Sequence, residues 1–425
     1  MRYILLIFTF VTFSVFSQIE EVRRITQTLC SKEFHGRGYV NQGDSIAAEY
    51  IAKEFKKIGL KPLKGKKYFQ SFQFNVNAFP GKMNVQIGSK KLIPGIHFLV
   101  DPSSARGFTT LKPKSISIQT ALSKDLLIQS INEIRESKEY NSVALEFQNA
   151  SKDTIKLLAG IADQIAEILP VIEISNKKLT WSVAQNQLKY PYLIVQDSVY
   201  QSNQEWKIEI DAHLIESHNA RNVIGYLKGT GGKNAKTLVF SAHYDHLGQM
   251  GLDTYFPGAN DNASGTAILI SMAKYFKDFP IDCNIIFMAF AGEEIGLLGS
   301  KYFVENPLVN LDKISFLVNL DIMGSGEDGI TVVNATKFEK EFDELVKINE
   351  DKQLLKQIKK RGPAANSDHY WFSEKGVPSF FIYTMGLNNN YHDIFDTYEA
   401  LSFQEYEDIT RLLVRFVSMF SHSKM

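Results

Sequence analysis

Two adjacent carboxylates, Glu293 and Glu294, follow the apolar run 284–290, whose sequence NIIFMAF has the length of a buried strand. Their charges repel, and burial would neutralise at least one of them unless a cation lies close by. The alternative is a solvated pair at the start of a helix, where carboxylates interact favourably with the helix dipole. The pair by itself leaves both interpretations open.

Other histidines and acidic residues have the same relation to the predicted strands. Each follows the carboxyl end of an apolar run or lies in the loop after it, where open α/β sheets bind their ligands. Any one of them could be an ordinary surface or turn residue. The set comprises His243, Asp245 and His246 after residues 237–242, Asp261 in the loop 258–265, Asp321 after residues 313–320, and His392 and Asp396 after residues 377–383.

Ligands at successive strand ends are hard to explain as independent accidents. Two imidazoles and three carboxylates at one rim would satisfy two borderline divalent cations if one carboxylate bridges them. One glutamate of the pair 293–294 could then bind metal while its neighbour acts as a base. The sequence therefore predicts a metal centre at this edge of the sheet.

The elements that position these residues alternate between strand and helix from residue 221 onward. Near-continuous apolar strands between amphipathic helices indicate an α/β fold, a three-layer sandwich around a mostly parallel mixed sheet. The expected strands are 222–227, 237–242, 284–290, 313–320, 329–333 and 377–383, and the expected helices are 264–279, 296–305, 338–351 and 402–420.

An earlier part of the same domain precedes a segment of different character. Residues 19–29 and 44–58 have the apolar spacing of helices. After residue 81, short β-like runs alternate with Lys- and Ser-rich turns, without a cluster of His, Asp or Glu. The predicted division is a signal peptide (1–17), a first catalytic part (18–80), a smaller β-rich inserted domain (81–218) and a second catalytic part (219–425).

The first 17 residues have the pattern of a secretory signal peptide. Arg2 precedes an apolar run, and the small Ser17 suits a cleavage site that would leave Gln18 as the new N-terminus. The run is short for a membrane span. We therefore expect a secreted or periplasmic protein whose mature chain has no membrane span; a retained N-terminal anchor is the alternative.

Bulk composition points away from several classes of partner. Lys+Arg and Asp+Glu both number 47, so charge gives no reason to expect nucleic acid or an anionic membrane surface. The two cysteines, Cys30 and Cys283, are too few for a cysteine-only metal site, and the sequence leaves open whether they pair. Function must come from a site.

Taken together, five motifs resemble the family M28 co-catalytic zinc peptidases of the aminopeptidase Y and leucyl aminopeptidase type, in an exported, bacterial-like form with an inserted domain. They occur in the order of the family over about residues 221–420. The motifs are His243-Tyr244-Asp245, Gly258–Gly265, Ala291–Glu294, Asn319-Leu320-Asp321 and Tyr391-His392.

The resemblance implies two Zn²⁺ ions per chain and a cis peptide bond between Asp261 and Asn262. It also implies the metal ligands. His243 and Asp321 would bind one zinc, Glu294 and His392 would bind the other, and Asp261 would bridge both.

The resemblance assigns catalytic and supporting residues as well. Glu293 would be the general base, and Tyr391 would hydrogen-bond the tetrahedral oxyanion. Asp245 would accept the other ring N–H of His243, and Asp396 would do so for His392. Asp368, in Ser367-Asp368-His369, would line the site. His246 is expected at the rim without a ligand role.

The implied activity is hydrolysis of the N-terminal peptide bond of peptides with a free N-terminus, in which Glu293 deprotonates a water that bridges the metals. A glutaminyl cyclase-like acyltransferase with one zinc on the same fold is the runner-up, and a metal-free binding protein is the third possibility. The loop 260–265 has the peptidase form. By position, the insertion resembles a protease-associated or lid-like domain. Residue preference, the type of exopeptidase and oligomeric state stay open.

Overall fold

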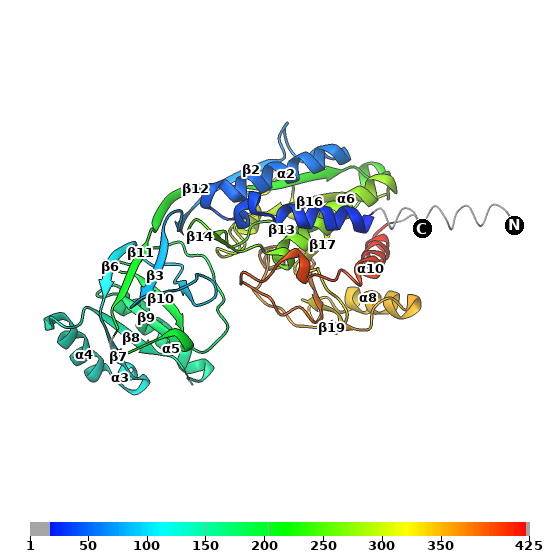
Figure 1. The fold of residues 1–425 in the computed structure, drawn as a ribbon. Coiled ribbons are helices and arrows are strands. Elements are labelled where there is room, and N and C mark those ends of the chain that lie inside the picture. Colours follow the sequence, from blue (N-terminus) through cyan, green and yellow to red (C-terminus); the bar gives the residue numbers. More distant parts are fainter. Residues whose placement is uncertain (1–17, 149, 203, 422–425) are drawn as a thin grey trace.

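The computed structural model describes residues 18–148, 150–202 and 204–421. The predicted signal peptide, residues 1–17, lies outside the described residues. Within them, no helix combines the length and the apolar character needed to cross a bilayer. Figure 1 shows a larger and a smaller body of secondary structure, with the long strand β12 running between them.

The larger body is built on a mixed sheet, which within the described residues has nine strands in the order β1-β12-β16-β13-β17-β20-β18-β19, with β2 also paired to β12. The four strands β16, β13, β17 and β20 are parallel to one another. Their carboxyl ends therefore meet at one edge. The strand bounds are β1 Lys61–Pro62, β2 Phe69–Ala78, β12 His213–Leu227, β13 Thr237–His243, β16 Asn284–Phe290, β17 Ile314–Leu320, β18 Gly329–Val333, β19 Ile358–Lys360 and β20 Ser379–Met385.

Helices cover both faces of this sheet, because alternate side chains of each central strand point to opposite faces. Phe240 and Phe287 pack with one group of helices, whereas Val239 and Ile286 pack with the other. The three-layer α/β prediction is confirmed. The first group comprises residues 18–29, α2 (Gly43–Ile58), α6 (Gly265–Asp278), α8 (Glu339–Lys352) and α10 (Tyr406–Ser418), and the second comprises α7 (Leu298–Glu305) and α9 (His369–Glu374).

Predicted element bounds differ from the structure mainly where a backbone reversal intervenes. The closing helix was expected from residue 402 but begins at Tyr406, because Phe403 has a positive φ of 50° and its N–H bonds to the carbonyl of Gly324. Likewise α7 begins two residues late, since Leu297 has a φ of 59°. The two cysteines, whose pairing was left open, are both buried free thiols.

The smaller body contains two sheets from the predicted insertion. A four-stranded antiparallel sheet lies against one face of a five-stranded sheet, and helices cover the other face. The long β12 crosses residue 218, where the insertion was predicted to end, and pairs with β2. The elements are β3 Met83–Ile87, β4 Lys90–Lys91, β6 Gly107–Leu111 and β11 Trp206–Ile210; β5 Phe98–Val100, β7 Pro113–Ile116, β8 Ser142–Glu146, β9 Val171–Ser175 and β10 Tyr192–Gln196; and α3 Ile118–Leu122, α4 Lys124–Glu136 and α5 Lys152–Ala166.

A buried carboxyl group in this body makes its stability depend on pH. Burial raises the pKa of Glu173 to about 7, although the Tyr192 hydroxyl donates to its Oε2 at 2.8 Å and acts in the opposite direction. The ordinary pKa of an unfolded glutamate is about 4.3. Because the folded state binds this proton more tightly, stability is greatest below that value and is lost as pH rises through about 7.

We expect Glu173→Gln to stabilise the protein at pH 8, by about 1–3 kcal/mol, and to have little effect near pH 4.5. The amide cannot ionise but still accepts from Tyr192. Thermal melts at both pH values measure the difference. Glu209→Gln is the control, because hydrogen bonding by Asn84 lowers the pKa of that exposed carboxylate. Equal melting of parent and Glu173→Gln at pH 8 would contradict the prediction.

Candidate metal centre

Five predicted ligands come together at the carboxyl edge of the large sheet. His243 is the last residue of β13, and Asp321 directly follows β17, its neighbour in the sheet. Glu294 lies in the turn after β16. Asp261 belongs to the π-helical turn Ala259–Ser264 before α6, and His392 lies in the loop after β20.

The two oxygens of Asp261 face two different histidines. Its Oδ1 lies 3.3 Å from Nε2 of His243, and its Oδ2 lies 3.2 Å from Nε2 of His392. A second carboxylate completes each half. Oδ1 of Asp321 is 3.3 Å from the His243 nitrogen, and Oε2 of Glu294 is 3.1 Å from the His392 nitrogen. The arrangement is therefore two half-sites that share one carboxylate.

The donor set fits a divalent cation. Ligand atoms of His243, Asp261 and Asp321 lie within 4.8 Å of one another, and so do those of His246, Asp261 and Glu294. Imidazole and carboxylate groups are ligands that zinc accepts. These groups could hold a metal ion.

Protons and metal would compete for the same two nitrogens. Burial lowers the pKa of His243, but Glu293 and Asp321 outweigh it and raise that pKa well above its usual range. Burial also opposes protonation of His392, yet Glu294 and Asp261 raise its pKa to about 11. The carboxylates thus demand positive charge at both imidazoles, which either a proton or a cation provides.

The adjacent glutamates have opposite electrostatic environments. Burial raises the pKa of Glu293 well above its usual range, and the charge of Glu294 adds to the effect. Burial acts in the same direction on Glu294, but His392 and His246 outweigh it and lower its pKa to about 2. One carboxyl group therefore tends to hold a proton and the other stays ionised, which is the separation that acid–base chemistry uses.

Asp245 does not support His243 in the predicted way. Nδ1 of His243 donates to the backbone carbonyl of Asp245 at 3.2 Å, whereas the nearest oxygen of the Asp245 carboxylate is 3.8 Å away. That carboxylate instead accepts from the backbone N–H groups of Glu293 and Glu294, at 3.2 and 3.3 Å. Asp245 therefore holds the turn that carries the two glutamates.

The prediction that Asp396 orients His392 is wrong. The Asp396 carboxylate accepts from the backbone N–H groups of Asn260 and Asp261, at 2.9 and 3.0 Å. Nδ1 of His392 donates instead to the backbone carbonyl of Trp181, at 3.0 Å. Asp396 thus fixes the loop that carries the shared ligand. The peptide bond between Asp261 and Asn262 is cis, as the resemblance implied.

Asp368 and Tyr391 flank the ligands without contacting them through hydrogen bonds. Asp368 is fully buried, and burial raises its pKa to about 7. The neighbouring Ser367 contacts the ligand, donating from Oγ to Oδ2 of Asp321 at 3.0 Å. The Tyr391 ring stacks on the His392 imidazole with centroids 3.9 Å apart and is 47% exposed, so it lies at the mouth of the site.

Sequence comparison agrees with this geometry. Residues 222–417 match the sequence model of peptidase family M28. The chain contains a peptidase family M28 domain. The predicted resemblance to this family is therefore confirmed.

Known relatives of the M28 domain are peptidases by name. The chain is 30% identical over 200 residues to aminopeptidase YwaD of Bacillus subtilis (strain 168), covering 44% of this chain and 41% of that one. It is 37% identical over 120 residues to a probable zinc metalloprotease of Pyrenophora teres f. teres (strain 0-1), covering 27% and 25%. The chain thus spans less than half the length of either curated relative.

A solved structure extends the likeness to nearly the whole fold. The zinc aminopeptidase BSAP from Bacillus subtilis aligns over 95% of this chain and 96% of its own, with a TM-score of 0.69 and 19% sequence identity. At that identity the alignment shows a shared fold.

Sequence reasoning missed two residues that shape the M28 domain's site. His246, expected at the rim, is fully buried, and its Nδ1 lies 2.6 Å from Oε1 of Glu294. Its spacing of three residues from His243 was the available signal. Arg37 is also fully buried and donates to the backbone carbonyls of Pro257, Gly258 and Asp261, at 2.7, 2.6 and 3.4 Å. Arg37 therefore fixes the loop that carries Asp261, the carboxylate shared by the two half-sites.

We expect His246→Gln to weaken zinc binding about 10- to 100-fold, because residues that orient a metal ligand carry effects of that size. Competition of the purified protein with a coloured zinc chelator measures the loss. His218→Gln is the matched control, since Nε2 of His218 contacts Oδ2 of Asp44 at 2.7 Å. An unchanged zinc affinity in His246→Gln, or an equal loss in His218→Gln, would show that His246 does not position Glu294.

Proposed function

We propose that this protein is an exported zinc aminopeptidase, which hydrolyses the N-terminal peptide bond of peptides with a free N-terminus. The observation that carries the proposal is the pair of half-sites sharing Asp261, next to the unequal carboxyl groups of Glu293 and Glu294. The relatives named as aminopeptidases and zinc metalloproteases support it. The leader predicted at residues 1–17 would direct the chain out of the cytoplasm.

The proposal assigns two zinc ions to one chain. His243 and Asp321 would hold one, His392 and Glu294 would hold the other, and Asp261 would hold both. Bound there, zinc supplies a Lewis acid for the scissile carbonyl and lowers the pKa of water so that it becomes a nucleophile. The shared carboxylate favours two ions over the single zinc of a glutaminyl cyclase.

Glu293 is the residue we assign to proton transfer. Its backbone N–H donates to Oδ1 of Asp245 at 3.2 Å, so the backbone that carries the side chain is fixed beside the half-sites. Its raised pKa suits a group that takes a proton from water and gives it to the leaving amine. Glu294 is a much weaker base, because His392 and His246 lower its pKa to about 2.

The remaining charges suit a substrate with a free amine. With two zinc ions offsetting the charge of the four carboxylates, carboxylate oxygens at the half-sites can still accept hydrogen bonds from the free amine of a substrate. Burial and the neighbouring carboxylates raise the pKa of Tyr391, so its hydroxyl stays protonated and can donate to an oxyanion. The position of Tyr391 at the mouth, stacked on His392, supports this role.

A panel of substrates with metal analysis on the same sample tests the function. We expect release of N-terminal residues from peptides with a free amine, no release from N-acetylated copies, and about two zinc ions per chain. The panel includes peptides that begin with glutamine. About one zinc ion per chain with formation of pyroglutamate would favour the cyclase and overturn the proposal.

We expect Glu293→Gln to retain zinc and to lose turnover by about 10²–10⁴-fold, since the amide cannot accept a proton. Steady-state kinetics and zinc content of the purified variant measure the two effects separately. Glu173→Gln is the matched control, because it makes the same change in the smaller body. Near-parental turnover in Glu293→Gln would remove that residue from the mechanism.

A further inference from the structure

The smaller body contributes directly to the metal centre. We propose that residues 178–185, here called the clasp segment, are a positioning element whose residue Trp181 fixes the orientation and tautomer of His392. The inference rests on the proposed function, in which His392 is a zinc ligand. It assigns the predicted insertion a task that the sequence left open.

Trp181 and His392 exchange two hydrogen bonds through the backbone of Trp181. The carbonyl of Trp181 accepts from Nδ1 of His392 at 3.0 Å, and its N–H donates to the carbonyl of His392 at 2.8 Å. A carbonyl can only accept, so the proton must lie on Nδ1. Nε2 is then the nitrogen that faces Asp261 and Glu294 and that would bind a metal there.

The backbone of His392 needs such support. Its φ of 55° lies in the left-handed region, which non-glycine residues rarely adopt. A residue in this conformation is held there by its surroundings. The clasp segment provides that restraint through its hydrogen bonds to both the ring and the carbonyl of His392.

Trp181 is itself fixed by both bodies. Its indole N–H donates to the carbonyl of Val100 in β5 at 2.8 Å, and its ring stacks on Phe256 with centroids 4.7 Å apart. The ring of Phe79, just beyond the end of β2, is tilted against the Trp181 ring with centroids 5.8 Å apart. With 4% of its surface exposed, Trp181 is an anchor for the segment.

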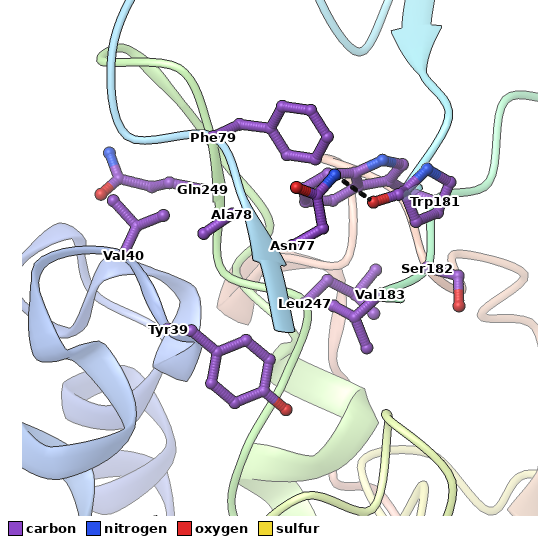
Figure 2. Close-up of a pocket in the computed structure, with 11 residues that line it drawn as sticks. Tyr39, Val40, Asn77, Ala78, Phe79, Trp181, Ser182, Val183, Leu247 and Gln249 are labelled. Carbon is purple, nitrogen blue, oxygen red and sulfur yellow. Dashed lines mark hydrogen bonds between the residues drawn. The ribbon is translucent and has the colours of Figure 1, made fainter. Parts of the chain in front are cut away.

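The rest of the clasp segment is seated against the larger body. Figure 2 shows Trp181, Ser182 and Val183 on one side of a small cavity, with Val40 and Gln249 on the other. The cavity measures about 10 Å³, the space of about one water, so the packing is close. The carbonyl of Ala184 accepts from the N–H of Asn77 at 2.8 Å, and Nε2 of Gln185 donates to the carbonyl of Ile295 at 3.1 Å.

Lys178 secures the loop on both sides of His392. Its Nζ donates to the carbonyl of Asn389 at 2.8 Å and pairs with the carboxylate of Asp393. The Asp393 side chain is 2% exposed, whereas that of Lys178 is 46% exposed. Next in sequence, Ile394 packs on the apolar cluster of the smaller body. Contacts with the smaller body, including those of the clasp segment, therefore hold the loop 389–394 as well as His392 itself.

Two variants test the clasp, with a matched control for each. Lys178→Met removes the ion pair but keeps most of the alkyl chain, and Lys112→Met is its control, because Lys112 is also 46% exposed and pairs with Glu205 at 2.9 Å. Trp181→Phe removes the donor to Val100, and Trp206→Phe, a change of another buried tryptophan of the smaller body, is its control. Lys178 lies at the surface, so Lys178→Met keeps the test valid if Trp181→Phe fails to fold.

We expect Lys178→Met and Trp181→Phe to bind one of two zinc ions about tenfold more weakly and the other as tightly as the parent, while both controls stay unchanged. Competition with a zinc chelator measures both affinities. Nitrogen NMR of histidine-labelled, zinc-loaded protein adds a second readout. It should show the His392 proton on Nδ1 in the parent, with exchange broadening in the two clasp variants.

The outcomes separate this inference from the proposed function. A parent that binds two zinc ions, with both clasp variants unchanged in affinity and NMR, overturns the clasp and leaves the aminopeptidase intact. Equal weakening of both zinc ions in the variants also overturns it, because the effect would then be general loosening. A parent that binds no zinc overturns both proposals.

Discussion

The structure depends on keeping several carboxylates together at one buried edge of a sheet. Asp261 and Asp321 are buried, and the Glu294 side chain is only 4% exposed. Such a cluster is stable only if positive charge is held among its oxygens. The two imidazoles on opposite oxygens of Asp261 mark where that charge must lie. Every loop of the site has to deliver one of these groups to that position.

Charged side chains around the centre act mainly on the backbone of those loops. Asp396 accepts from N–H groups of the Asp261 loop, and Arg37 donates to carbonyls of the same loop. In the same way, Asp245 accepts from the N–H groups of Glu293 and Glu294 and so fixes the turn that carries them. The carboxylates thus bind the N–H ends of the peptide groups, and the guanidinium of Arg37 binds the carbonyl ends. The loops are fixed without using the ring nitrogens or carboxylate oxygens that a metal needs.

The difference between side chains that would bind metal and side chains that hold the backbone explains what the sequence could predict. The strand 284–290 was correct at both ends because parallel strands buried on both faces are continuous apolar runs, and ligands follow such runs at recognisable places. The partners of those ligands were harder to find, since a backbone carbonyl exists at every residue and carries no sequence signal. Trp181 was therefore missed, and Asp396 was assigned to the wrong group. His246 was misplaced because burial of its ring depends on contacts across the fold.

The residues of one half-site are placed by strands and those of the other by loops. This difference explains what the smaller body contributes. His243 ends β13 and Asp321 follows β17, so neighbouring strands of one sheet set their separation. Glu294 and His392 come from loops, and the conformation of His392 has its restraint from the clasp segment. A displacement of the smaller body would leave the first pair and Glu294 in place, because Asp245 and His246 hold Glu294, and would move His392. The chain thus joins a half-site fixed by the sheet to one that exists only while the two bodies stay in contact.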